Sequence, residues 1–128
     1  MSAVNSVNWF ELYVQDMAQA RAFYEAVFGI VLEPLKSPDA GDPLEMWSFP
    51  GDMDRYGANG ALCRMPGAPS GPGGTLVYFA TDDCAQTAAR VPGAGGRVHR
   101  EKMSIGPYGF IALVFDPEGN MIGLHSMQ

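Results

Sequence analysis

The sequence is short of the residues that mark secreted, disulfide-bonded and membrane proteins. It has only two cysteines, Cys63 and Cys84, and they form no CxxC motif. With no recognisable secretory leader, this cysteine usage favours a reducing, cytoplasmic location over a disulfide framework. No apolar run approaches the length of a membrane-spanning helix, so no membrane partner is expected.

Basic residues are also scarce. Eight Lys and Arg stand against 14 Asp and Glu, which gives a net charge of −6. A nucleic-acid or anionic-membrane partner is therefore not expected, because both require clustered Lys and Arg. The only basic cluster, Arg97, Arg100 and Lys102, is interpreted as a solvated strand face, and His99 within it as a surface residue.

The residues that are present predict one compact domain over residues 1–128. Hydrophobic residues make up 47% of the chain, which is enough for an adequate core. A Pro- and Gly-rich stretch at 66–73 is typical of a linker. It separates a first module, about residues 5–65, from a second, about residues 74–128.

Two internal alignments indicate that the modules are copies of one unit. A shift of 67 residues superposes Asp16 on Asp83, with five further identities in the same ungapped register. A second shift, of 62 residues, superposes 54–65 on 116–127. Equivalent positions in the two modules can therefore be compared directly.

Each module has the predicted order β-α-β-β-β. Asp16 and Asp83 are predicted helix caps, and Gly29 is predicted to end the first helix in a left-handed conformation. Pro92 should end the second helix near Val91, because proline lacks the backbone donor. The predicted strands span residues 7–14, 30–35, 44–49, 60–65, 74–81, 97–103, 108–115 and 120–127.

Three segments resemble the vicinal-oxygen-chelate superfamily of glyoxalases, bleomycin-resistance proteins and extradiol dioxygenases. They are Phe-Glu-Leu-Tyr-Val-Gln-Asp at 10–16, Ala-Phe-Tyr-Glu-Ala-Val-Phe-Gly at 22–29 and Asp-Pro-Glu-Gly-Asn-Met-Ile-Gly-Leu at 116–124. The resemblance covers almost the whole chain. It implies an α+β fold in which two βαβββ modules form a curled mixed sheet around a shared cavity.

The resemblance also implies where a metal would be held in metal-dependent members, on the first and last strands of each module. Carried over to this sequence, the positions are Trp9, Leu76, Ala61 and Gly123. None of these side chains can ligate a divalent ion, which needs His, Asp, Glu or Cys donors. No metal and no other cofactor is therefore expected.

The next row of the same strands carries four titratable side chains, Glu11, Cys63, Tyr78 and His125. Glu11 and His125 are candidate acid–base residues and Tyr78 a candidate hydrogen-bond donor. A relocated metal site on Glu11, Cys63 and His125 is an alternative. Each of the four could also be an ordinary buried residue with its polar atoms satisfied.

Aromatic residues and Cys63 are candidates for the walls of a ligand pocket, although each could equally belong to an ordinary core. The loop 103–109, with two glycines and a proline, could form a lip over the cavity. The candidate ligand-binding residues are Trp9, Trp47, Phe49, Cys63, Tyr108 and Phe110.

Two functions of different classes remain open at this point. The first is a glyoxalase-like enzyme, of lyase or isomerase type, that uses Glu11 as acid or base. The second is a non-catalytic protein that sequesters a small ligand, as bleomycin-resistance members do. Fold alone cannot choose between them, and the sequence leaves open whether the chain is an enzyme. A small molecule and a second copy of the chain, in a homodimer, are the expected partners.

Overall fold

The computed structural model describes residues 5–37 and 41–128. The predicted loop 36–43 therefore lies partly outside the described residues. The chain forms two compact units. Among the described residues, the first unit is Trp9–Thr75, and the second is Leu76–Gln128 together with residues 5–8. No helix in the described ranges is long and apolar enough to cross a membrane.

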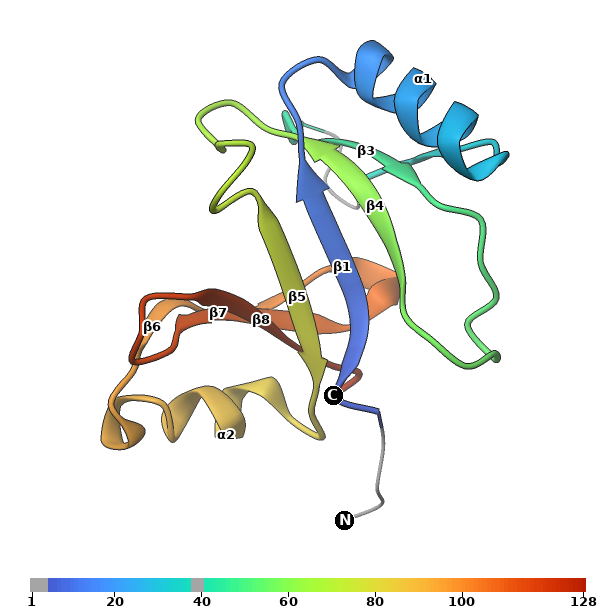
Figure 1. Ribbon diagram of the computed structural model, residues 1–128. Coiled ribbons are helices and arrows are strands. Elements are labelled where there is room, and N and C mark those ends of the chain that lie inside the picture. The colour runs from blue at the N-terminus through green and yellow to red at the C-terminus, as the bar shows by residue number, and fades with distance from the viewer. Residues whose placement is uncertain (1–4, 38–40) are drawn as a thin grey trace. The chain divides into compact units, whose positions relative to one another are not determined.

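The first unit is a four-stranded sheet with one helix (Figure 1). Its strands lie in the order β2-β3-β4-β1, with β1 parallel to β4 and the other pairs antiparallel. One apolar cluster, centred on Met17, Leu32 and Leu62, lies between the helix and the sheet. The elements are β1 (Val7–Tyr13), α1 (Met17–Phe28), β2 (Glu33–Leu35), β3 (Glu45–Ser48) and β4 (Asn59–Arg64).

The second unit repeats this pattern. Its strands lie in the order β5-β8-β7-β6, with β5 parallel to β8, and Cys84, Ala88 and Leu124 belong to the cluster between sheet and helix. The elements are β5 (Thr75–Ala80), α2 (Cys84–Ala89), β6 (Arg97–Ser104), β7 (Phe110–Phe115) and β8 (Met121–Ser126), with 3₁₀ turns at Pro92–Ala94 and Gly106–Tyr108. The predicted α+β class and the βαβββ order are confirmed.

The helix ends follow the capping residues seen in the sequence. The Asp16 carboxylate accepts from Gln19 N at 3.0 Å, and Gly29 ends α1 with φ of 64°. A side chain is disfavoured at that φ, so glycine is the suitable residue there. Asp83 accepts from Ala85 N at 2.9 Å. The α2 helix ends at Ala89, slightly before the predicted stop near Val91, because the last amides bond three residues back in a tighter turn.

Two predicted strand boundaries are wrong, each for a local reason. The strand predicted at 30–35 begins only at Glu33. Leu32 N bonds the Glu25 side chain at 2.9 Å, and the Leu32 side chain fills the core, so this segment is tied to α1 instead of a neighbouring strand. The strand predicted at 108–115 begins at Phe110, because Gly106–Tyr108 is a 3₁₀ turn and Gly109 has φ of 101°.

Candidate functional site

The first strand places a carboxylate on the face of its sheet that carries no helix, here called the open face of the first unit. Side chains alternate along a strand, so Trp9, Glu11 and Tyr13 share this face. Leu12 and Val14 point the other way and pack with the cluster beneath α1. Glu11 is only 7% exposed, which is unusual for a glutamate.

Two aromatic side chains donate hydrogen bonds to this buried carboxylate. Trp9 Nε1 donates to Glu11 Oε2 at 3.2 Å, and Tyr13 Oη donates to Glu11 Oε1 at 2.8 Å. Both oxygens of the carboxylate therefore have a donor, which offsets part of the desolvation of a buried charge. Tyr13 was not among the predicted site residues, although its two-residue spacing from Glu11 was a usable signal.

Strand β4 pairs with β1 and places two side chains beside Glu11. Ala61 lies opposite Glu11 and Cys63 opposite Tyr13 in the parallel register, and both side chains are fully buried. Burial raises the pKa of the Cys63 thiol far above its usual range, and the negative charge of Glu11 raises it further. A neutral, buried thiol is a poor nucleophile. Cys63 therefore lines the Glu11 face as a small apolar group.

We expect the Cys63 thiol to be unreactive in the folded protein. A thiol reagent such as Ellman's reagent at pH 8 should leave Cys63 unmodified until denaturant is added, because the thiolate is strongly disfavoured. The variant Cys84→Ser isolates the signal of Cys63. Rapid modification of this variant in native buffer would show an accessible thiolate and contradict the described environment.

Two of the predicted aromatic wall residues lie on the helix side of the first sheet. Trp47 pairs with Leu62, packs with the cluster beneath α1, and has the Arg21 Cζ atom 3.5 Å from its ring centroid. Phe49 packs against Tyr24 with ring centroids 5.7 Å apart. The residues of β3 that share a face with Ala61 and Cys63 are instead Ser48 and Met46, which sequence reasoning missed.

In the second unit, Tyr78 occupies the space over Gly123. The two residues lie opposite each other in the parallel β5–β8 register, and Tyr78 is 6% exposed. A Cβ atom built on Gly123 would collide with the Tyr78 ring. Gly123 is the position at which the family resemblance places a metal-binding carboxylate. Here the position has no side chain and the space above it is filled.

His125, two residues further along β8, is held by hydrogen bonds at both ring nitrogens. Its Nε2 lies 2.6 Å from the Tyr108 carbonyl oxygen, and its Nδ1 lies 3.1 Å from Asn8 Nδ2. Since a carbonyl can only accept, Nε2 carries the proton, and a neutral Nδ1 can then accept from the Asn8 amide. His125 therefore ties the loop before β7 to Asn8, near the start of β1. Asn8 was missed because it is 117 residues away.

We predict that His125→Phe loosens the loop before β7. Loss of the bond to the Tyr108 carbonyl should lower the free energy of unfolding by about 1–2 kcal/mol. It should also speed amide hydrogen exchange at Tyr108 and Gly109. Asn8→Ala, which leaves the Tyr108 bond in place, is the matched control and should leave exchange in the loop nearly unchanged. Equal exchange in wild type and His125→Phe would contradict this role.

The two predicted wall residues in the second unit, Tyr108 and Phe110, differ in their surroundings. The Tyr108 side chain is 47% exposed, and it is the backbone carbonyl of this residue that contacts His125. Phe110 packs against the cluster beneath α2, with Lys102 Nζ 4.6 Å from its ring centroid. Its ring therefore lies on the helix side of the sheet, opposite to His125.

The side chains at the expected ligand positions do not fit the divalent ion that metal-dependent members of the family bind. The four carried-over positions hold Trp9, Ala61, Leu76 and Gly123, none of which is a ligand. Both nitrogens of His125 are engaged, and the Cys63 side chain is fully buried. Within residues 5–37 and 41–128, no group of three or more His, Cys, Asp and Glu side chains could hold a metal ion.

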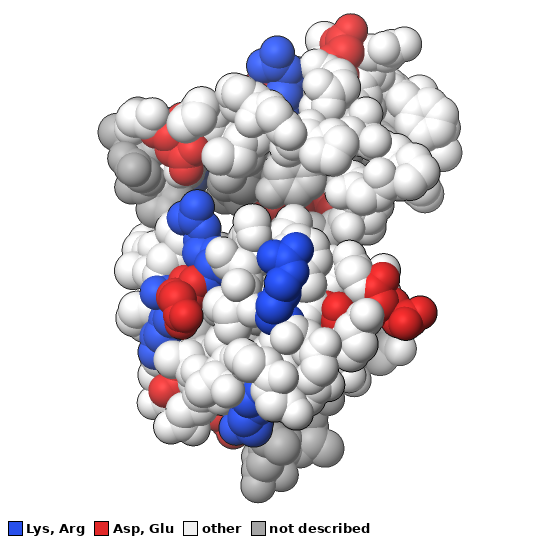
Figure 2. All heavy atoms as spheres, turned by 90° about the vertical axis from the view of Figure 1, so that its left-hand side faces the viewer, with Lys and Arg blue, Asp and Glu red and all other residues white. Residues whose placement is uncertain are grey.

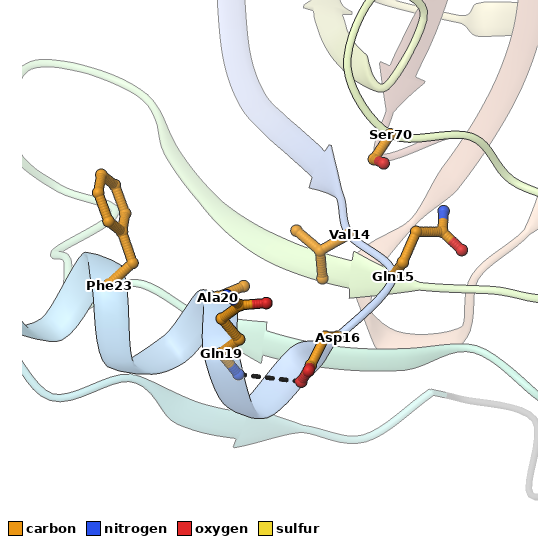
Figure 3. Close-up of a pocket in the computed structure, with 7 residues that line it drawn as sticks. All are labelled: Val14, Gln15, Asp16, Gln19, Ala20, Phe23 and Ser70. Carbon is orange, nitrogen blue, oxygen red and sulfur yellow. Dashed lines mark hydrogen bonds between the residues drawn. The ribbon is translucent and has the colours of Figure 1, made fainter.

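A surface hollow of about 420 Å³ lies at the start of α1 in the first unit (Figure 3). Figure 3 shows Asp16 turned toward the backbone of Gln19, where it caps the helix, and Phe23 one helical turn beyond. The hollow is lined by Val14, Gln15, Asp16, Gln19, Ala20, Phe23 and Ser70. None of the predicted site residues lines it, so we assign it no role in the chemistry.

Comparison with solved structures shows the same fold in proteins of low sequence identity. Methylmalonyl-CoA epimerase from Mycobacterium tuberculosis matches with a TM-score of 0.68 and 15% identity, covering 100% of this chain and 93% of that one. The hypothetical protein BH1468 from Bacillus halodurans matches with a TM-score of 0.70 and 10% identity, covering 95% and 94%. At such identities the likeness concerns the fold alone.

Curated relatives are closer in sequence. CFP32 of Mycobacterium tuberculosis, provisionally named as a glyoxylase, is 32% identical over 119 residues, which is 91% of this chain and 44% of the relative. The anthracycline biosynthesis protein DnrV of Streptomyces peucetius is also 32% identical, over 87% of this chain and 43% of the relative. This chain thus spans less than half the length of these relatives.

A family model matches residues 6–124, nearly the whole chain, and includes both modules. The match extends over the strands that carry Glu11 and Gly123 and over both capped helices. The chain belongs to the Glyoxalase/Bleomycin resistance protein/Dioxygenase superfamily.

Proposed function

We propose that this chain is a small-molecule enzyme of glyoxalase-like type in which the carboxylate of Glu11 transfers protons without a bound metal. The observation that carries the proposal is a glutamate, 7% exposed, whose two oxygens accept from Trp9 and Tyr13 on a helix-free sheet face. Buried and oriented carboxylates of this kind are suited to general acid–base chemistry.

The reaction class that fits is removal and return of a proton on a carbon next to a carbonyl group. Such a step needs one base held in a fixed orientation, and Trp9 and Tyr13 hold Glu11 in this way. An epimerase, the activity named for several structural relatives, must invert a carbon centre. Epimerisation next to a carbonyl can use such a proton transfer, so this fold can accommodate the reaction class.

Deuterium exchange tests this proposal with probe compounds in place of the natural substrate. The probes are methylmalonyl-CoA, named with a structural relative, and phenylacetone, a small aromatic ketone with exchangeable C–H bonds. Incubation in D₂O should incorporate deuterium next to the carbonyl faster with the protein than without it, as followed by proton NMR. Exchange with neither probe would count against the proposal.

Ligand sequestration without chemistry is the second candidate. The indole of Trp9 and the phenol of Tyr13 flank Glu11, and the neutral Cys63 lies beside them, so this face could also hold an aromatic ligand passively. A native mass spectrum of the purified protein that shows a retained small molecule, together with no deuterium exchange, would favour this candidate.

A further inference from the structure

The edge strand of the second unit carries basic side chains on its helix-free face. Arg97 lies opposite Phe115 and Arg100 opposite Leu113 in the β6–β7 register, whereas Lys102 turns to the helix side and binds Asp83 at 3.1 Å. Figure 2, viewed from the side on which β6 lies in Figure 1, shows several blue side chains there, with red ones beside them. The sequence analysis interpreted Arg97, Arg100 and Lys102 as one solvated strand face. In the structure, Lys102 lies on the opposite face of β6 from the two arginines.

An aromatic ring lies beneath this group. Arg97 Cζ is 4.1 Å from the centroid of the Phe115 ring, and the His99 ring meets Phe115 edge-on with centroids 5.4 Å apart. The register of β6 shifts between Val98 and Arg100. An irregularity of this kind can bring consecutive side chains to the same face, as the contact of His99 with Phe115 requires.

The two arginines have no carboxylate partner among the described residues. The ion pairs there hold Arg21, Arg55 and Lys102, but neither Arg97 nor Arg100. Arg100 donates only a weak hydrogen bond to Met103 Sδ, at 3.4 Å.

The carboxylate that lines a hollow together with Arg97 is occupied by its own turn. Asp116 and Arg97 both line a hollow of about 320 Å³ beside Phe115, but Asp116 accepts hydrogen bonds from Glu118 N, Asn120 N and Asn120 Nδ2. The bonds from Asn120, side chain first, hold the pKa of Asp116 below its usual range. Asp116 therefore stays charged and bound to its turn, and the Arg97 guanidinium rests on a ring.

We propose that Arg97, Arg100, His99 and Phe115 form a binding site for an anionic group attached to a flat apolar body. Arg97 and Arg100 lie opposite residues two apart on β7, about 6–7 Å along the strand. Two planar guanidinium groups at that spacing can bind the oxygens of one carboxylate or phosphate. The Arg97 guanidinium, whose inner face rests on Phe115, can stack its outer face on a flat ligand. The site lies within the second unit and does not depend on any role of Glu11.

The test is a titration of the full chain with phenyl phosphate, followed by ¹⁵N–¹H NMR. Shifts should concentrate on the amides of Gly96, Arg97 and Phe115, and affinity should fall with added NaCl. The double variant Arg97→Ala/Arg100→Ala should weaken binding at least about tenfold, as expected for loss of charge-assisted contacts. Arg55→Ala, which removes an exposed arginine of the first unit, is the matched control and should bind as wild type does.

Further probes test separately the contributions of the ring and of the anion, and compare a phosphate with a carboxylate. Phenol lacks the anion and inorganic phosphate lacks the ring, so both should bind more weakly than phenyl phosphate. Phenylacetate shows whether a carboxylate is preferred to a phosphate. Unchanged binding in the double variant, with its NMR spectrum showing a folded protein, would overturn the proposal. Absence of binding by every anionic probe in wild type would overturn it too.

Discussion

The substitution Gly123→Glu, which returns a carboxylate to the position where the family places a metal ligand, should destabilise the protein and create no metal site. We expect the free energy of unfolding to fall by about 2–4 kcal/mol, the range for forcing a side chain and a charge into filled space. The Tyr78 ring lies where the new Cβ must go. Chemical denaturation followed by tryptophan fluorescence measures the change.

A control substitution and a double-mutant cycle separate the collision with the Tyr78 ring from a general effect of the new charge. Met121→Glu adds the same group two residues earlier on the same face of β8 and should lower the free energy of unfolding by less. The cost of Gly123→Glu should be smaller in a Tyr78→Ala background than in wild type, because the ring is absent there. A Gly123→Glu variant as stable as wild type, or one that binds zinc tightly, would contradict the described packing.

The substitution Glu11→Gln should abolish most of the proton-exchange activity and leave the fold intact. Glutamine keeps the size and one acceptor oxygen of glutamate but cannot take up a proton at neutral pH. We expect the deuterium-exchange rate to fall by about 10²–10⁴-fold, the usual contribution of a general base. The measurement is the D₂O exchange rate with whichever probe wild type accepts, with thermal unfolding as the check on folding.

Three neighbouring substitutions show whether the loss belongs to the carboxylate. Cys63→Ser should change the exchange rate only a few-fold, because the Cys63 thiol is neutral and buried. Tyr13→Phe and Trp9→Phe each remove one donor to Glu11 and should have intermediate effects. A larger loss in Cys63→Ser than in Glu11→Gln would remove the acid–base assignment.

Local signals in the sequence were sufficient for the elements and for the position of Glu11. Asp16 and Gly29 mark the ends of α1 because capping depends on the few residues at each end. The two-residue period of β1 places Trp9, Glu11 and Tyr13 on one face, as the hydrogen bonds show. The duplication then gave the same strand order in both units.

Features that depend on distant residues could not be predicted in this way. An aromatic residue in a short strand can face either side, and only the pairing of Trp47 with Leu62 places it beneath α1. His125 bonds a residue 117 positions away and a backbone carbonyl, neither of which leaves a mark on the local sequence. Leu32 was predicted to lie in a strand but is not part of β2, because the Glu25 side chain, on α1, accepts a hydrogen bond from its backbone N–H.

We propose that in this chain a buried carboxylate, Glu11, takes the place of the metal bound by metal-dependent family members. The most direct test is a titration of chelator-treated protein with Zn²⁺, Ni²⁺ and Co²⁺ at neutral pH, followed by native mass spectrometry. Our account predicts no tight stoichiometric complex with any of the three ions. A tight one-to-one complex in wild type that is lost in Glu11→Gln or His125→Ala would contradict it.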